Sequence, residues 1–266
     1  MSSNAPIGVY DSGFGGLSVW RELRRLLPNE SLIYLGDGKN CPYGGRPRAE
    51  IESFAMSAVE RLVSEGVKMV VVGCNTATTA AVERLRERWG DMPIVGLEPA
   101  VKPACLSTKS RKIAVLATAH SLSSDMFLAT AARYAEDVEV VKVVGEGFVE
   151  LVERDMEHSE EAERLVRNAV EPLLDKGVDK IVLGCTHYPF LRPLIERVVE
   201  GHGIDVIDSG EAVARRVAWL IERYDIAAEE DNTPTMRYIT FADEEYRKRL
   251  EMKAQRVINE DKYGKR

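Results

Sequence analysis

Cysteine is the residue type in this chain that most clearly points to chemistry. The four cysteines are Cys41, Cys74, Cys105 and Cys185. Cys74 and Cys185 each follow an apolar run that ends in glycine, and each precedes a segment with a helical pattern. Unpaired N–H groups and the dipole at a helix N-terminus stabilise a thiolate and lower its pKa. This placement predicts reactive thiols at Cys74 and Cys185, whereas Cys41 and Cys105 lack it and are interpreted as unreactive.

The two cysteines occupy equivalent places in an internal repeat. Residues 65–74 (EGVKMVVVGC) align without gaps to residues 176–185 (KGVDKIVLGC), an offset of 111 (185 − 74). The same offset relates the apolar runs around Val95 and Val206, and residues 7–12 are loosely echoed by 113–118. Buried parallel strands resemble one another, so chance similarity is the alternative. The shared glycines and cysteines favour two related halves.

Two thiols on opposite sides of a shared cleft could invert a carbon centre. One thiolate would remove a proton from one face, and the other thiol would deliver a proton to the opposite face. Two inert core cysteines are the alternative, since free cysteine is commonly buried. Asp11 and His187 are candidate proton-handling neighbours of Cys74 and Cys185, respectively, and histidine titrates near neutral pH.

These residues must be positioned by a parallel α/β scaffold, because β-branched runs alternate with amphipathic helical stretches. Ligands of such sheets bind beyond the carboxyl ends of the strands. The glycine-rich loop 13–16 fits a carboxylate site or a tight turn, since it matches neither a dinucleotide fingerprint nor a P-loop. The predicted strands are Pro6–Tyr10, Leu32–Leu35, Val67–Gly73, Ile94–Gly96, Lys112–Ala117, Val138–Val144, Lys180–Gly184, Asp205–Ile207 and Arg237–Phe241. Predicted helices include Leu17–Leu27, Arg48–Ser64, Glu160–Asp175, Gly210–Tyr224 and Glu244–Val257.

Composition narrows the class of protein. The 266 residues are 45% hydrophobic and 30% charged, with a net charge of −7, as in an ordinary globular protein. The sequence has no long basic stripe of the kind that binds nucleic acid. It also has no apolar run typical of a signal peptide or a membrane-spanning helix. A cytoplasmic location is therefore expected, with reduced thiols. No CxxC or Cys/His zinc spacing occurs.

Taken together, the loops resemble the glutamate racemase family, within the aspartate/glutamate racemase superfamily. The resemblance spans nearly the whole chain. The matching segments are Asp11-Ser12-Gly13-x-Gly15-Gly16, Tyr34-Leu35-Gly36-Asp37, Pro42-Tyr43-Gly44, Gly73-Cys74-Asn75-Thr76-Ala77, Gly184-Cys185-Thr186-His187-Tyr188-Pro189 and Asp208-Ser209-Gly210.

The resemblance implies two doubly wound, pseudo-symmetric, flavodoxin-like domains around an interdomain active-site cleft. The expected domains are residues 1–98 plus 210–266, carrying Cys74, and residues 99–209, carrying Cys185. It also implies no cofactor and no metal. The implied catalytic residues are Cys74, Cys185, Asp11, His187 and Glu153. The expected substrate-binding residues are Asp11, Ser12, Pro42, Tyr43, Gly44, Asn75, Thr76, Thr118, Ser121, Thr186 and His187.

The implied activity is interconversion of L- and D-glutamate, which supplies D-glutamate for peptidoglycan. Glutamate is the expected small-molecule partner and a homodimer a candidate assembly, with no nucleic acid or membrane partner. The alternatives are a racemase of aspartate or another amino acid, a related lyase or decarboxylase, a glutamate-binding protein without catalysis and, least favoured, a thiol-redox protein. The chain departs from the family at Ala117-Thr118-Ala119-His120-Ser121, where Gly-Thr-x-Gly-Thr is common. The departure therefore concerns the expected substrate contacts at Ser121 rather than the thiol chemistry.

Overall fold

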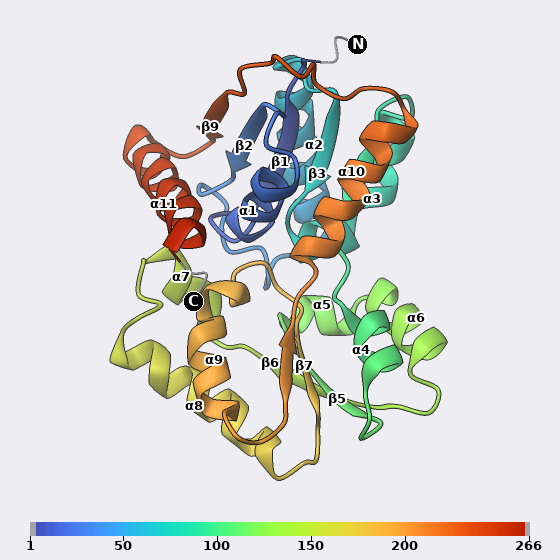
Figure 1. Cartoon of the computed structure of the whole chain (residues 1–266), viewed down its shortest axis with the longest axis vertical. Helices are drawn as coiled ribbons and strands as arrows, with labels where there is room; N and C mark the ends of the chain where they lie inside the picture. Colours follow the sequence, from blue (N-terminus) through green and yellow to red (C-terminus); the bar gives the residue numbers. More distant parts are fainter. Residues whose placement is uncertain (1–3, 264–266) are drawn as a thin grey trace. The chain divides into compact units, whose positions relative to one another are not determined.

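A computed structural model of the chain describes residues 4–263 and divides them into two compact units. Residues 4–97 and 210–263 belong to the first unit, and residues 98–209 form the second. Each unit is built on one parallel sheet covered by helices (Figure 1). No described helix is long and apolar enough to cross a membrane.

The first unit orders its strands β4-β3-β1-β2-β9, all parallel. Helices α2 and α3 pack together, and α1 packs with α10 and α11. A Cβ on Gly8 of β1 would contact Leu62 of α2, whereas one on Gly36 of β2 would contact Leu250 of α11. Since Gly8 pairs with Ile33, and Ile33 and Gly36 have opposite parity on β2, α2 and α11 cover opposite faces. The elements are β1 (Ile7–Asp11), α1 (Leu17–Leu26), β2 (Leu32–Gly36), α2 (Arg48–Ser64), β3 (Met69–Val72), α3 (Asn75–Arg88), β4 (Ile94–Gly96), α10 (Gly210–Arg223), β9 (Met236–Thr240) and α11 (Glu244–Tyr263).

The second unit orders its strands β6-β5-β7-β8, again all parallel. Successive residues of β5 enter different cores: Ala114 and Leu116 pack in one cluster, Ile113 and Val115 in the other. This alternation places helices on both faces, which is the doubly wound arrangement. The elements are α4 (Val101–Ser107), β5 (Lys112–Ala117), α5 (Ala119–Ser123), α6 (Asp125–Tyr134), β6 (Glu139–Val144), α7 (Phe148–Glu153), α8 (Glu160–Leu174), β7 (Lys180–Leu183), the 3₁₀ turn η1 (Tyr188–Leu191), α9 (Arg192–Val199) and β8 (Asp205–Ile207).

The internal repeat is visible in the strand orders. The order β4-β3-β1-β2 in the first unit corresponds to β8-β7-β5-β6 in the second. The central pairs share one register, with Ile7 opposite Met69 and Ile113 opposite Lys180. The register of the β3–β4 pair differs by one residue from that of the β7–β8 pair. Val70 lies opposite Ile94, whereas Ile181 lies opposite Val206, one residue beyond the position that the 111-residue offset gives for Ile94. The prediction of two pseudo-symmetric parallel sheets is thus confirmed, with every predicted strand present and its ends within two residues of the predicted ends.

A buried ion pair fixes the late return of the chain to the first sheet. The Lys68 ammonium lies 2.5 Å from the Glu30 carboxylate, and both side chains are almost fully buried. Lys68 also donates to the carbonyl of Ile226 at 2.7 Å, and Glu30 accepts the N–H of Ala228 at 2.9 Å. These bonds hold the segment between α10 and β9, so that β9 can pair with β2.

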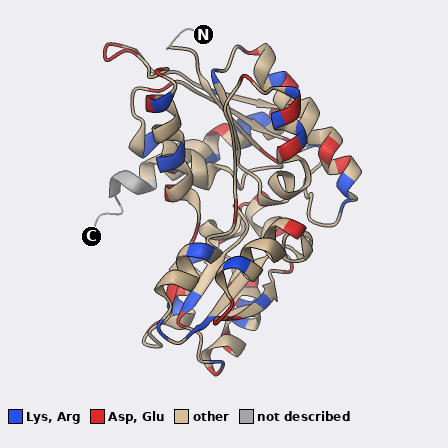
Figure 2. Ribbon diagram, turned by 90° about the vertical axis from the view of Figure 1, so that its right-hand side faces the viewer, with Lys and Arg blue, Asp and Glu red and all other residues tan. Residues whose placement is uncertain are grey.

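Surface charge of both signs is interspersed along the helices (Figure 2). On α8, Arg167 lies between Glu163 and Glu171 and pairs with both, one turn away in each direction. Exposed pairs of this kind contribute a few tenths of a kcal/mol each.

Asp179 secures the entry to β5 in the second unit. Its carboxylate accepts hydrogen bonds from the Thr108 hydroxyl and from the N–H groups of Lys109 and Ser110. Burial acts to raise the pKa of Asp179, but these bonds outweigh it and lower the pKa to about 2. The folded-state pKa lies below the ordinary value of 3.8, so this stabilisation is present above that value and is lost as the pH falls through 2.

Replacing Asp179 with Asn should therefore destabilise the protein in a pH-dependent way. At pH 6 we expect a loss of about 1 kcal/mol, reduced from the full shift by solvent screening, and a fall in Tm of about 2 °C. The difference should shrink between pH 4 and pH 2. Thermal unfolding of D179N beside D175N, which changes an exposed aspartate at the end of α8, tests this. A loss of stability in D179N that is the same near pH 2 as at pH 6 would contradict this role of Asp179.

Candidate functional site

In the first unit, a thiol, a hydroxyl and a carboxylate follow one another at the ends of two paired strands. Asp11 ends β1, Ser12 is next, and Cys74 comes two residues after β3, which pairs with β1. Cys74 Sγ lies 3.6 Å from Ser12 Oγ, and Ser12 Oγ lies 3.5 Å from Asp11 Oδ1. All three residues are buried. A proton on the Cys74 thiol therefore has a hydroxyl and then a carboxylate as its neighbours.

Cys74 is also the N-cap of α3. Its Sγ accepts the N–H of Ala77 at 3.4 Å. A helix N-terminus favours negative charge, so this position stabilises a thiolate. Asn75 and Thr76 form the first turn of α3 and are 3% and 4% exposed. Among the described residues, the buried Nδ2 of Asn75 has no hydrogen-bond partner. A buried donor without a partner is costly, which suits a group that a ligand would satisfy.

The loop after β2 is organised around Tyr43. Its hydroxyl donates to Asp37 Oδ2 at 2.6 Å and accepts from the Tyr10 hydroxyl at 2.7 Å. Asn40 donates to both oxygens of Asp37. Burial raises the pKa of Tyr10 and of Tyr43 well above their ordinary value, so both hydroxyls keep their protons. Pro42 and Gly44 are the chain neighbours of Tyr43, so the hydrogen bonds of the Tyr43 hydroxyl also restrict where their backbone lies.

Close packing explains one glycine of the loop after β1. A Cβ on Gly16 would lie 2.7 Å from Asp11 Cβ and 2.8 Å from the Tyr34 hydroxyl. The same hydroxyl donates to the carbonyl of Gly13 at 2.8 Å, and the N–H of Gly13 donates to Asp11 at 2.7 Å. The glycine-rich segment is thus a tight turn held against Asp11.

In the second unit, Cys185 has a different environment from the one its sequence suggests. It follows β7, but it lies in a turn, and α9 starts only at Arg192 after the 3₁₀ turn Tyr188–Leu191. The expectation of a helix N-terminus at this thiol is therefore wrong. Pro189, near the start of the 3₁₀ turn, has no N–H to donate, and the helix begins beyond it.

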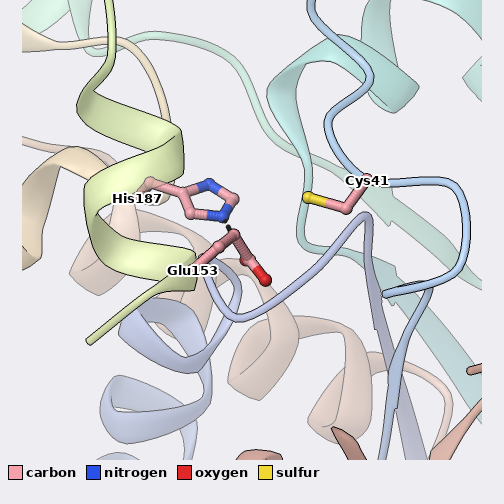
Figure 3. A group of neighbouring side chains, drawn as sticks. All are labelled: Cys41, Glu153 and His187. Atoms are coloured by element: carbon pink, nitrogen blue, oxygen red, sulfur yellow. Dashed lines mark hydrogen bonds and ion pairs between the residues drawn. The ribbon is translucent and has the colours of Figure 1, made fainter. Parts of the chain in front are cut away.

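A histidine and a glutamate support Cys185 instead. His187 Nδ1 lies 3.8 Å from Cys185 Sγ. On its other side, His187 Nε2 lies 2.7 Å from Glu153 Oε1 (Figure 3). Burial acts to lower the pKa of His187, but its bonds with Cys185 and Glu153 outweigh burial and raise the pKa well above its ordinary value. The imidazole can therefore hold a positive charge beside the thiol. These residue types also bind metals, but here both ring nitrogens already contact protein groups.

The remaining predicted residues of this unit also follow strand ends. Thr118 caps the short helix α5: its Oγ1 accepts the N–H of Ser121 at 3.2 Å and donates to Ser121 Oγ at 3.0 Å. Ser121 is buried, as is Thr186 beside Cys185. At the family departure, the serine hydroxyl is thus retained and held by Thr118.

The structure adds residues that the sequence reasoning did not assign to the site. Asp37 and Tyr10 position Tyr43, and Tyr34 positions Gly13. Asp37 follows β2 directly, as Cys74 and Cys185 follow closely on β3 and β7, so the rule that sites lie at strand ends could have found it. The roles of Tyr10 and Tyr34 depend on hydroxyl contacts that no local pattern shows.

Comparison with known proteins places the chain in a family. The family model described as Asp/Glu/Hydantoin racemase matches residues 7–217. A glutamate racemase from Ectopseudomonas mendocina is 46% identical over 226 residues, which cover 85% of this chain and 86% of the relative. One from Herpetosiphon aurantiacus is 44% identical over 238 residues, covering 90% and 93%. The chain belongs to the Asp/Glu/Hydantoin racemase family.

Solved structures of this racemase family agree with the fold. The Escherichia coli glutamate racemase, in a complex that contains L-glutamate, superposes with a TM-score of 0.84 at 32% identity and 95% coverage of both chains. The Francisella tularensis glutamate racemase, solved with D-glutamate, has a TM-score of 0.83 at 24% identity, covering 97% of this chain and 94% of that one. The latter likeness supports the fold alone.

The ion pair of His187 with Glu153 leads to a prediction about the pKa of His187. Glu153→Gln keeps a hydrogen-bond acceptor but removes the charge, so the pKa of His187 should fall by about one unit or more. Histidine ring signals in an NMR pH titration would report it, with the His187 signal assigned by its loss in H187Q. Glu150→Gln, an exposed change on the same helix, is the matched control. An unchanged titration of His187 in E153Q would contradict the pairing.

Proposed function

We propose that this chain interconverts L- and D-glutamate without a cofactor, with Cys74 and Cys185 as the two acid/base groups. The observation that carries the proposal is the equivalence of the two thiols: each follows the same strand of its unit and each has its own proton-handling neighbours. Relatives that carry the name glutamate racemase, and a homologous structure that contains L-glutamate, support this choice of substrate.

At Cys74, the thiolate is the species stabilised by the start of α3. Ser12 and Asp11 lie in sequence behind the sulfur: the Ser12 hydroxyl accepts from the Cys74 thiol and donates to Asp11, and in the thiolate state its one proton can turn to the sulfur instead. The thiolate takes the α-proton of one glutamate enantiomer, and the thiol form returns a proton to that face in the reverse direction.

At Cys185, charge is balanced by a side chain rather than by a helix. An imidazolium at His187, held by Glu153, stabilises the Cys185 thiolate through Nδ1. In one direction Cys185 delivers a proton to the α-carbon as Cys74 removes one, and in the other direction the roles are exchanged. Each turnover adds a proton to one cysteine, which starts as the thiolate, and removes a proton from the other, which starts as the thiol. The enzyme therefore ends with the thiol and the thiolate interchanged.

The α-hydrogen of an amino acid is a very weak acid, so the site must stabilise the negative charge that develops on deprotonation. We propose that hydroxyl, amide and backbone groups hold the two carboxylates of the substrate. On the Cys74 side these are Ser12, Pro42, Tyr43, Gly44, Asn75 and Thr76. On the Cys185 side they are Thr118, Ser121, Thr186 and His187.

The physiological consequences follow from the activity. We propose that the D-glutamate produced enters peptidoglycan, that the enzyme acts in the cytoplasm, and that a homodimer is its candidate assembly. The two compact units are proposed as its domains, each contributing one thiol to the reaction.

The two-thiol mechanism predicts the behaviour of cysteine variants. Cys74→Ala and Cys185→Ala should each lower kcat by about a thousandfold or more, because each removes one of two required proton carriers. In deuterated water, any residual exchange of the α-hydrogen should occur without inversion, and the two variants should exchange opposite enantiomers. Chiral chromatography with mass detection measures both quantities.

Cys105→Ala is the control for these variants. Cys105 lies in α4, packs in an apolar cluster, and burial raises the pKa of its thiol. Its removal should leave turnover near that of the parent. Near-normal inversion by either the Cys74 or the Cys185 variant would refute the two-thiol mechanism. Exchange in the parent with aspartate but not with glutamate would instead overturn the substrate.

The buried amide of Asn75 makes a separate prediction. If it binds a substrate carboxylate, Asn75→Ala should raise KM about tenfold, the loss expected for one hydrogen bond to a charged group. Asn75→Asp should be worse, since it places a carboxylate beside a carboxylate. Steady-state kinetics beside thermal unfolding separate binding from stability: a KM equal to that of the parent in N75A would rule out the contact.

A further inference from the structure

Phe14 is an apolar side chain in the middle of the glycine-rich loop that carries Ser12. It is fully buried. Its ring stacks on that of Tyr246 in α11, with centroids 4.8 Å apart and planes inclined by 26°. Stacked aromatic pairs of this kind attract one another beyond the effect of the area that they bury. Helix α11, whose Tyr246 lies 232 residues after Phe14 in the chain (246 − 14), thus packs against this loop.

The same face of α11 supplies further contacts to Phe14. The Arg249 guanidinium and the Lys253 ammonium lie 5.3 Å and 5.6 Å from the centroid of the Phe14 ring. Positions 246, 249, 250 and 253 recur at helical spacing, and Leu250 between them is fully buried. One face of the helix therefore encloses one aromatic ring of the loop.

The loop after β2 meets the same helix. A Cβ on Gly38 would lie 2.2–2.5 Å from atoms of the Tyr246 ring. A Cβ on Gly36 would lie 3.4 Å from Leu250 and 3.0 Å from the carbonyl of Gly13. Tyr246 is consequently wedged between the segment that holds Phe14 and the segment that leads to Asp37.

A short path of contacts leads from this wedge to the thiol. Phe14 follows Gly13, whose N–H and carbonyl are bonded to Asp11 and Tyr34. Ser12, on the other side of Gly13, has its hydroxyl 3.6 Å from Cys74 Sγ. A displacement of Phe14 would move Ser12, because only one residue separates them.

We propose that α11 sets the position of the Ser12 hydroxyl at Cys74 through the Tyr246–Phe14 stack, which makes Tyr246 a positioning residue for the racemase. The inference rests on the proposed function for its catalytic meaning. Its structural content, the control of the Cys74 thiol by a distant helix, can be measured without turnover.

The first measurement isolates Cys74. In a full-length background with Cys41, Cys105 and Cys185 replaced by Ser, the rate of alkylation by iodoacetamide against pH reports the thiolate of Cys74. Tyr246→Ala should shift the midpoint of this profile by about half a unit to one unit relative to the parent, because the Ser12 hydroxyl that contacts Cys74 Sγ is displaced. Tyr246→Phe retains the stack and should match the parent.

Two control variants show whether any effect is specific. Met252→Ala changes an exposed residue on α11, and Tyr224→Ala removes an exposed tyrosine beyond the end of α10. Both should leave the alkylation profile unchanged. Phe14→Leu removes the stack from the other side with an apolar side chain in place, and it should reproduce the shift even if Tyr246→Ala lowers the Tm too far to be used.

The second measurement is turnover in the otherwise unaltered chain. Tyr246→Ala and Phe14→Leu should lower kcat about tenfold, with Tyr246→Phe restoring it. An alkylation midpoint in both stack-deleting variants equal to that of the controls would overturn the proposal, as would equal impairment by Tyr246→Phe. If the two stack-deleting variants shift the midpoint but the parent racemises no glutamate, the proposed function is refuted and the positioning role stands.

Discussion

Parallel pairing of β1 with β3, and of β5 with β7, is the constraint from which the site follows. Parallel strands end at the same edge of a sheet, so residues that follow two neighbouring strands become neighbours whatever their separation in sequence. Asp11 and Cys74 are brought together in this way, joined by Ser12. The N–H of Gly73 bonds to the carbonyl of Tyr10, and that of Gly184 to Leu116, so each thiol leaves its sheet from a fixed point.

Duplication gives the two thiols the same scaffold but not the same surroundings. Cys74 gains stabilisation from backbone groups at the start of α3, which do not titrate. Cys185 depends on the imidazole of His187, whose charge varies with pH and is held by Glu153. In the proposed mechanism two groups exchange roles between the two directions, and the negative charge of the two thiols proposed for this is balanced by different means.

Most of the scaffold could be predicted because its signals are local. Buried strands such as β3 and β7 are short, mostly apolar runs, and Gly-Cys follows both at equivalent positions of the two halves. The environment of Cys185 could not be predicted from the same pattern, because Pro189 and a 3₁₀ turn take the place of a helix start. The role of Tyr10 could not be predicted for another reason: its hydroxyl reaches Tyr43 from the interior of β1, and no local pattern shows that contact. The Phe14–Tyr246 stack joins the two ends of the chain, beyond the reach of any local pattern.

The insertion of the second unit between β4 and α10 has a consequence for biosynthesis. A ribosome makes β1 to β4 first, then the whole of the 98–209 unit, and only afterwards β9 and α11. Until then β2 is an unpaired edge of the nascent sheet, a template for pairing with other chains. The loop beside Cys74 also lacks its contacts with α11 during that interval, so the thiol at position 74 emerges early but acquires its final surroundings among the last events of synthesis.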